Sequence, residues 1–158
     1  MERKQRTIKS SQSCQGVGLH TGVKSNITFH PAPENSGICF VRSDIPNCSK
    51  IKADIDHVVD ISRGTTIQEN GVKIHTVEHA LAAVSGLRID NMLIELTGKE
   101  PPVMDGSAKD FVECIIKAGV KIQDKERKVL EITKAVNYTN SYRDIDIHVI
   151  PSDRFRIT

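Results

Sequence analysis

The residues of this sequence best suited to catalysis or metal binding are an adjacent glutamate and histidine, Glu78 and His79. The pair lies within residues 75–82, which read HTVEHALA. A neutral imidazole is a common zinc ligand, and a carboxylate beside the metal can take a proton from a water that the metal activates. The pair therefore supplies two parts of a zinc hydrolase site. It is not a complete site, because a catalytic zinc usually needs three protein ligands and an open position for water.

The same residues also have structural explanations. A glutamate in the first turn of a helix is favoured by the helix dipole, and a histidine on a helix often lies half-buried beside apolar neighbours. For Glu78 and His79 alone, these structural roles are the favoured reading. With His75 the pair also forms the pattern His-x-x-Glu-His, which in inverted zinc metalloproteases places both histidines on one helix face. Because His75 precedes the expected N-cap Thr76, this geometry is not expected, and His75 is expected to face solvent.

A hairpin and a short helix would position the pair. The dipeptide Asn70-Gly71 is a strong signal for a two-residue hairpin turn. Thr76 suits the N-cap of the following helix, and Gly86 suits its C′ position. We therefore expect a helix over residues 76–85, with Glu78 and His79 in its first turn.

Strand patterns precede and follow this helix. They cover residues 5–15, 26–30, 37–42, 51–61, 65–68, 72–74 and 92–96. A rigid turn then feeds a second helix, in which Ser107 and Asp110 resemble a capping box and Gly119 closes the end. The pattern predicts an α+β domain over residues 1–125, with about five strands and two helices in a two-layer arrangement of sheet and helices.

Residues 126–158 are predicted to be a linker and the opening strands of a second, similar domain. A charged stretch is followed by two alternating segments and a short last one, at residues 124–128, 129–138, 145–150 and 155–158. This layout loosely resembles that of the N-terminal segment. An unpaired strand is an unfavourable place for a chain to finish, since an open edge invites association. We therefore expect the chain to be a truncated fragment.

The composition favours a folded soluble domain and gives no indication of a nucleic-acid-binding or membrane protein. The chain has 158 residues, of which 38% are hydrophobic and 27% charged, so a folded soluble domain is expected. The formal net charge of +2 gives no reason to expect nucleic acid or membrane binding. No apolar run could span a bilayer or serve as a signal peptide, which favours the cytoplasm. The cysteines show no Cys-x-x-Cys spacing and are expected to be reduced thiols: Cys14, Cys39, Cys48 and Cys114.

Four sequence blocks, taken together, resemble one enzyme family. They are Gly16–Gly22 (GVGLHTG), Thr76–His79 (TVEH), Gly86–Asn91 (GLRIDN) and Met104–Ala108 (MDGSA). Their order and spacing resemble the zinc-dependent UDP-3-O-acyl-N-acetylglucosamine deacetylases of lipid A biosynthesis, across essentially the whole chain. The resemblance implies two similar α+β domains packed face to face, with the active site between them.

The resemblance also implies roles for three residues. His79 corresponds to a ligand of the one Zn²⁺, and Glu78 to the general base that activates the water on that zinc. His20 borders the site as a substrate-binding or catalytic residue; the alternative is a ring that is simply exposed in a glycine-rich turn. The remaining ligands, a histidine and an aspartate, and the general-acid histidine belong to the second domain of the family and are expected beyond residue 158. The fragment alone is therefore expected to bind zinc weakly and to be inactive.

The implied partner is an acylated UDP-N-acetylglucosamine, and an exposed sheet face or edge could also make the fragment self-associate. The competing hypothesis is a non-enzymatic α+β binding module, in which Glu78 and His79 are structural and partners dock on a strand edge. A histidine and an aspartate three or four residues apart on a helix beyond residue 158 would favour the enzyme. Arg63 and Thr65 could face the substrate from a loop, although a solvated loop is favoured. The remaining polar residues are expected to be structural: His30, His57, Asp105, Ser107 and His148.

Overall fold

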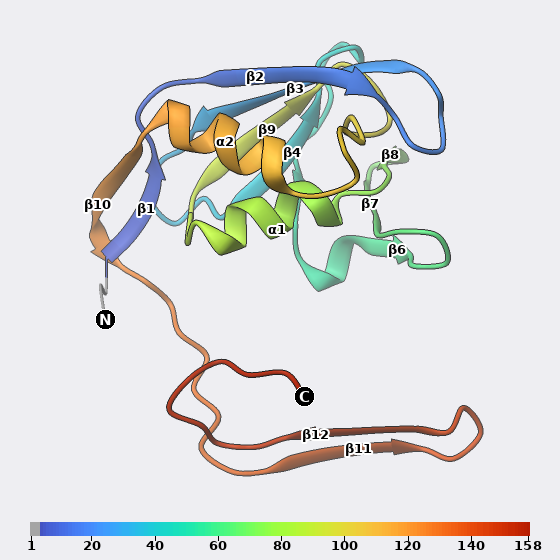
Figure 1. Ribbon diagram of the computed structural model, residues 1–158, viewed down its shortest axis with the longest axis vertical. Helices are drawn as coiled ribbons and strands as arrows, with labels where there is room; N and C mark the ends of the chain where they lie inside the picture. The colour runs from blue at the N-terminus through green and yellow to red at the C-terminus, as the bar shows by residue number, and fades with distance from the viewer. Residues whose placement is uncertain (1–3) are drawn as a thin grey trace. The chain divides into compact units, whose positions relative to one another are not determined.

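The computed structural model describes residues 4–158 (Figure 1). The chain divides into two compact units, Met1–Arg127 and Lys128–Thr158. The first unit contains both α-helices and ten of the strands, and the second contains a single hairpin. The expected α+β class is confirmed, although the first unit has twice the expected number of strands.

A five-stranded sheet forms the framework of the first unit. Its strands, in spatial order, are β2 (Gln12–Val17), β3 (Lys24–Pro31), β9 (Met92–Leu96), β4 (Ile38–Arg42) and β5 (Ile51–Lys52). Neighbours pair antiparallel except β4 and β9, which are parallel. Burial alternates along the central strands β3 and β9, because successive side chains point to opposite faces of a sheet.

Two helices cover one face of this sheet: α1 (Glu78–Gly86) and α2 (Lys109–Ala118) (Figure 1). The rings of Phe29 on β3 and Phe111 on α2 meet edge to face, with centroids 6.1 Å apart. Both side chains are fully buried, together with most of the aliphatic residues of the inner strand faces. On α1, three small apolar side chains are buried in the same core, and they fix this helix, with Glu78 and His79, against the sheet: Ala80, Ala83 and Val84.

Two smaller sheets complete the first unit. In one, β1 (Lys4–Ile8) pairs antiparallel with β10 (Val120–Glu126), and in the other β6 (Val58–Asp60), β7 (Thr66–Glu69) and β8 (Val72–Ile74) form a meander. Strand β10 corrects the prediction of a charged linker at residues 124–128, because the strand continues to Glu126. The expected strand over residues 51–61 is divided by a short 3₁₀ helix, η1 (Ile55–His57).

The two turns that flank β8 differ in how well their sequences predict them. Asn70 and Gly71 both have positive φ, +47° and +80°, as the expected two-residue hairpin turn requires. The next turn corrects a prediction, because Thr76 is not the N-cap of α1. The helix begins at Glu78, with Val77 at the N-cap and no capping side chain.

The C-terminus of α1 also differs from the prediction. Gly86 is the last helical residue, and the left-handed C′ residue is Arg88, with φ +55°. Its N–H donates to Ser85 O at 2.9 Å, and the N–H of Ile89 donates to Val84 O at 3.0 Å, which together make a Schellman motif. Val84 and Ile89 are both buried, so the apolar contact of this motif outweighs the strain of a non-glycine residue at C′.

The start of α2 is a smaller correction. The helix begins at Lys109 with Ala108 at the N-cap. In the preceding turn, the backbone N–H and the hydroxyl of Ser107 both donate to Asp105 Oδ1, at 2.9 and 2.7 Å. The Ser107 hydroxyl still accepts the N–H of Lys109 at 3.1 Å. Gly119 ends the helix with φ +72°, as predicted.

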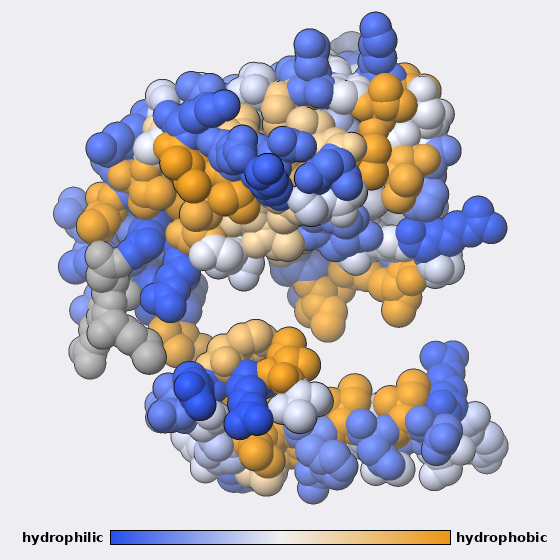
Figure 2. All heavy atoms as spheres, viewed as in Figure 1, coloured by the Kyte–Doolittle hydropathy of each residue, from blue (hydrophilic) through white to orange (hydrophobic). Residues whose placement is uncertain are grey.

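The second unit contains an antiparallel hairpin of β11 (Val136–Asn140) and β12 (Ile145–Val149). Apolar and charged side chains are mixed along this hairpin (Figure 2), and nearly all of its residues are exposed. The strand expected over residues 155–158 is wrong, because the chain has no regular structure there. Across residues 4–158, neither helix has the length and apolar character that a membrane span requires.

Candidate active site

The carboxylate of Glu78 is held by a loop that precedes it in sequence. Its Oε2 accepts the backbone N–H of Thr65 at 2.8 Å, and Thr65 is half-buried. A β-carbon added to Gly64 would lie only 2.9 Å from Glu78 Oε1. Thr65 lies in a loop, as expected, but it is half-buried, and the backbone of residues 64 and 65 packs directly on the carboxylate.

Thr76 turns the chain from β8 into α1 with an unusual backbone. Its φ is +57°, a left-handed conformation that is a genuine outlier for a β-branched residue. Two hydrogen bonds fix the turn: the Thr76 hydroxyl donates to Glu100 Oε1 at 2.7 Å, and the N–H of Val77 donates to Thr65 O at 3.2 Å. Strained residues of this kind persist only where their surroundings hold them, and they often mark functional sites.

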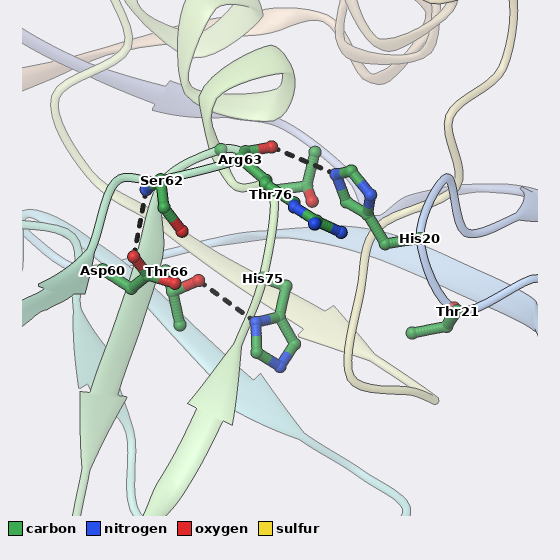
Figure 3. Close-up of a pocket in the computed structure, with 9 residues that line it drawn as sticks. His20, Thr21, Asp60, Ser62, Arg63, Thr66, His75 and Thr76 are labelled. Carbon is green, nitrogen blue, oxygen red and sulfur yellow. Dashed lines mark hydrogen bonds between the residues drawn. The ribbon is translucent and has the colours of Figure 1, made fainter.

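His20 reaches the same region from the glycine-rich turn between β2 and β3. Its backbone N–H donates to the carboxylate of Glu100, at 3.1 and 3.2 Å from the two oxygens, and the N–H of Thr21 donates at 3.0 Å. The exposed His20 ring lies with Nε2 3.1 Å from the backbone oxygen of Arg63 (Figure 3). The structure thus brings the loop of Arg63, which was expected to be solvated, against His20.

Glu100 carries a negative charge in this buried setting. Its side chain is fully buried, which alone would raise its pKa. The hydrogen bonds from Thr76, Thr21 and His20 outweigh burial, and the pKa of Glu100 falls below its usual value. The carboxylate is therefore ionised at neutral pH.

A hollow of about 250 Å³ opens between these loops (Figure 3). It is lined by His20, Thr21, Asp60, Ser62, Arg63, Gly64, Thr66, His75 and Thr76. His75, expected to face solvent, is half-buried, and its Nδ1 lies 3.1 Å from the Thr66 hydroxyl. Glu78 does not line the hollow itself, but it contacts the loop residues that form the wall.

His79 follows Glu78 in the first turn of α1 and is half-buried. Its ring has no hydrogen-bond or ion-pair partner within residues 4–158, so neither ring nitrogen is engaged by another group in that range. No cluster of three or more metal-binding side chains occurs in that range. His75 lies outside α1, so the two histidines do not share a helix face as an inverted metalloprotease motif would require.

The remaining histidines have local partners, in keeping with the structural roles expected of them. His30 lies between Ser11 and Glu95, and His148 contacts Asn137. His57 lies between Asp54 and Glu69, and the hydrogen bond to Asp54 raises its pKa. The four cysteines are free thiols.

Comparison with known proteins identifies the family. Residues 5–158 match the model of the UDP-3-O-acyl N-acetylglycosamine deacetylase family. The chain belongs to this family. The resemblance inferred from the four sequence blocks is thereby confirmed.

Several curated proteins of the deacetylase family are similar to this chain over 98% of its length. A bifunctional enzyme LpxC/FabZ of Chlorobaculum tepidum is 51% identical over 154 residues, which are 33% of that protein. UDP-3-O-acyl-N-acetylglucosamine deacetylases of Thermodesulfovibrio yellowstonii and Myxococcus xanthus are 45% and 44% identical, over 51% and 48% of their lengths. The chain thus spans a third to a half of the relatives that it matches.

Two residues of this candidate site, Gly64 and Glu100, were not predicted from the sequence. Neither belongs to a recognisable motif, and Glu100 is followed by two prolines that indicate only a turn. Their importance lies in contacts with distant residues, since the partners of Glu100 are 24 to 80 positions away. A local pattern holds no signal for such contacts.

Proposed function

We propose that the intact protein hydrolyses the acetamide of a UDP-3-O-(3-hydroxyacyl)-N-acetylglucosamine, a step of lipid A biosynthesis. The observation that carries this proposal is the pair at the start of α1: an oriented carboxylate, Glu78, beside an imidazole without a partner, His79. Membership of the deacetylase family and the names of the relatives support it.

His79 is proposed as a zinc ligand. Its half-buried ring, free of other bonds, suits a neutral imidazole donor. Bound zinc would polarise the acetamide carbonyl and lower the pKa of a water toward neutrality. Because residues 4–158 contain no cluster of three ligands, we propose that the remaining ligands come from outside this range, and that the 158-residue chain alone is inactive.

Glu78 is proposed as the general base. The N–H of Thr65 holds one carboxylate oxygen, Oε2, and leaves Oε1 to accept a proton from the attacking water. This hydrogen bond fixes the orientation of the carboxylate before substrate binds. His20, whose ring is exposed at the rim of the hollow, is proposed to contact the substrate.

The first test is zinc dependence of the intact protein, measured as acetate release together with zinc content. Chelation is expected to abolish turnover and added zinc to restore it. His79→Ala is expected to lose the zinc and to lower turnover by orders of magnitude. His30→Ala, which removes a half-buried histidine on β3, is the matched control and should retain both. A zinc-loaded wild type without acetate release would instead favour the non-enzymatic binding module.

Gly64→Ala is expected to impair the site by displacing Glu78. A methyl group at this position would lie 2.9 Å from Glu78 Oε1, and φ is +145°. We expect the strained backbone to lower the free energy of unfolding by about 1–3 kcal/mol. Turnover per folded molecule should also fall, because Glu78 is displaced. Urea unfolding and acetate release measure the two effects.

Gly71→Ala is the matched control for this substitution. Gly71 also has positive φ, +80°, but has nothing within 4 Å of an added β-carbon. It is expected to lose stability and to keep its turnover per folded molecule. Equal turnover in both variants would contradict the proposed contact between residue 64 and the base.

A further inference from the structure

Glu100 is a fully buried carboxylate in the loop between β9 and α2. Its hydrogen bonds come from two separate segments. The backbone N–H groups of His20 and Thr21 donate from one side, and the hydroxyl of Thr76 donates from the other. One side chain therefore ties the glycine-rich turn to the junction between β8 and α1.

The turn that carries His20 is closely fitted around this carboxylate. The N–H of Gly18 donates to Val23 O at 2.9 Å, and the N–H of Gly22 donates to Gly18 O at 3.1 Å. A β-carbon added to Gly18 would lie 2.6 Å from Glu100 Oε2. The ring of His20 is exposed, so its direction depends on the anchored backbone and on its one contact with Arg63 O.

Thr76 is the second attachment point. Its left-handed backbone has a free-energy cost of about 1–3 kcal/mol that the surroundings must offset. A charge-assisted hydrogen bond to a buried carboxylate is among the stronger bonds available for this. Glu78 lies two residues further along the chain, so the conformation of Thr76 sets where α1 and its carboxylate begin.

We propose that Glu100 is a positioning residue, whose carboxylate holds the His20 turn and the Thr76 turn in one geometry so that His20 and Glu78 act on the same substrate. This inference rests on the proposed function. Glu100 itself does not touch the substrate, because it is covered on all sides.

The chemistry of the site predicts how three variants of the intact protein differ. Glu100→Ala leaves the three donors of this cluster without their acceptor, one of them the buried hydroxyl of Thr76, and is expected to lower kcat/KM by about 10²-fold. Glu100→Asp keeps the charge, but its side chain is one methylene shorter and cannot reach both segments, so a similar loss is expected. In Glu100→Gln the amide oxygen can accept the two N–H groups and the amide nitrogen can donate to Thr76. The kcat/KM of Glu100→Gln is therefore expected to stay within about tenfold of the wild-type value.

A double-mutant cycle separates positioning from general stabilisation. If Glu100 acts through His20, its replacement matters less once the imidazole is gone. Glu100→Asp is therefore expected to cost less in the His20→Ala background than in the wild type. Glu95→Gln, on the partly exposed side of β9, is the control and should keep wild-type kinetics. Independent, multiplicative losses in the cycle would overturn the proposal.

Amide hydrogen exchange of residues 18–23 gives a readout that does not depend on activity. Glu100→Asp and Glu100→Ala are expected to speed exchange of the His20 and Thr21 amides, and Glu100→Gln to leave it near the wild-type rate. Unchanged exchange in Glu100→Asp would refute the anchoring. An intact wild-type protein without deacetylase activity would refute the proposed function. The exchange rates of the His20 and Thr21 amides would still show whether Glu100 anchors the turn. Glu100→Asp keeps the test valid should Glu100→Ala fail to fold.

Discussion

Glu78→Gln in the intact protein is expected to lower kcat of deacetylation by about 10²–10⁴-fold, the usual contribution of a positioned general base. A carboxamide has nearly the same shape as the carboxylate and can still accept the N–H of Thr65, but it cannot take a proton from water. Because the interaction is lost only in the transition state, kcat and kcat/KM should fall together. Steady-state acetate release over a range of substrate concentrations measures both constants.

Zinc content and thermal unfolding give the controls for this variant. Glu78 is not a proposed ligand, so Glu78→Gln should retain the zinc that His79→Ala loses. The Thr65 contact is preserved, so the unfolding temperature should change little. Glu113→Gln, an exposed glutamate on α2, is expected to behave as the wild type in every assay. A Glu78→Gln enzyme with wild-type kcat would exclude Glu78 as the base.

Features encoded by neighbouring residues were predictable from the sequence. The Asn70-Gly71 turn and the end of α2 at Gly119 are examples, because both depend on backbone freedom at single positions. The adjacency of Glu78 and His79 is likewise a local property. The four sequence blocks, taken together, also predict the family correctly.

Features that depend on distant partners were not predictable. Threonine is a common N-cap residue, but the hydroxyl of Thr76 donates to Glu100 instead, and its backbone is left-handed. The charged residues of β10 have the composition of a linker, yet β1 supplies a pairing edge more than a hundred positions earlier. In both cases a tertiary contact outweighs the local preference, which a sequence pattern cannot reveal.

The same limit applies to the surroundings of Glu78. Thr65 and Gly64 lie 13 and 14 positions before it, in a loop whose polar composition indicated only exposure to solvent. The turn of His20 is held by a residue 80 positions later. The sequence therefore indicates the candidate reactive groups, Glu78 and His79, and only the structure shows which residues contact Glu78 and the turn of His20.

Two adjacent isoleucines on α2 test the packing of the helices on the sheet. Truncating one of them is expected to lower stability strongly, and truncating the other is not. Ile115 on α2 is fully buried, whereas the neighbouring Ile116 is 58% exposed. Ile115→Ala removes a core side chain and is expected to destabilise the 158-residue chain by about 2–5 kcal/mol. Since whole domains are stable by only about 5–15 kcal/mol, this loss should be evident in urea unfolding.

Ile116→Ala is the matched control, because it makes the same substitution one position along the same helix. Both variants gain the same helix propensity, so this contribution cancels in their difference. The exposed position should change the free energy of unfolding by less than about 1 kcal/mol. If the two variants unfold at the same urea concentration, α2 does not pack on the sheet through Ile115. The contact between Phe111 and Phe29 that fixes the helix layer would then also be in doubt.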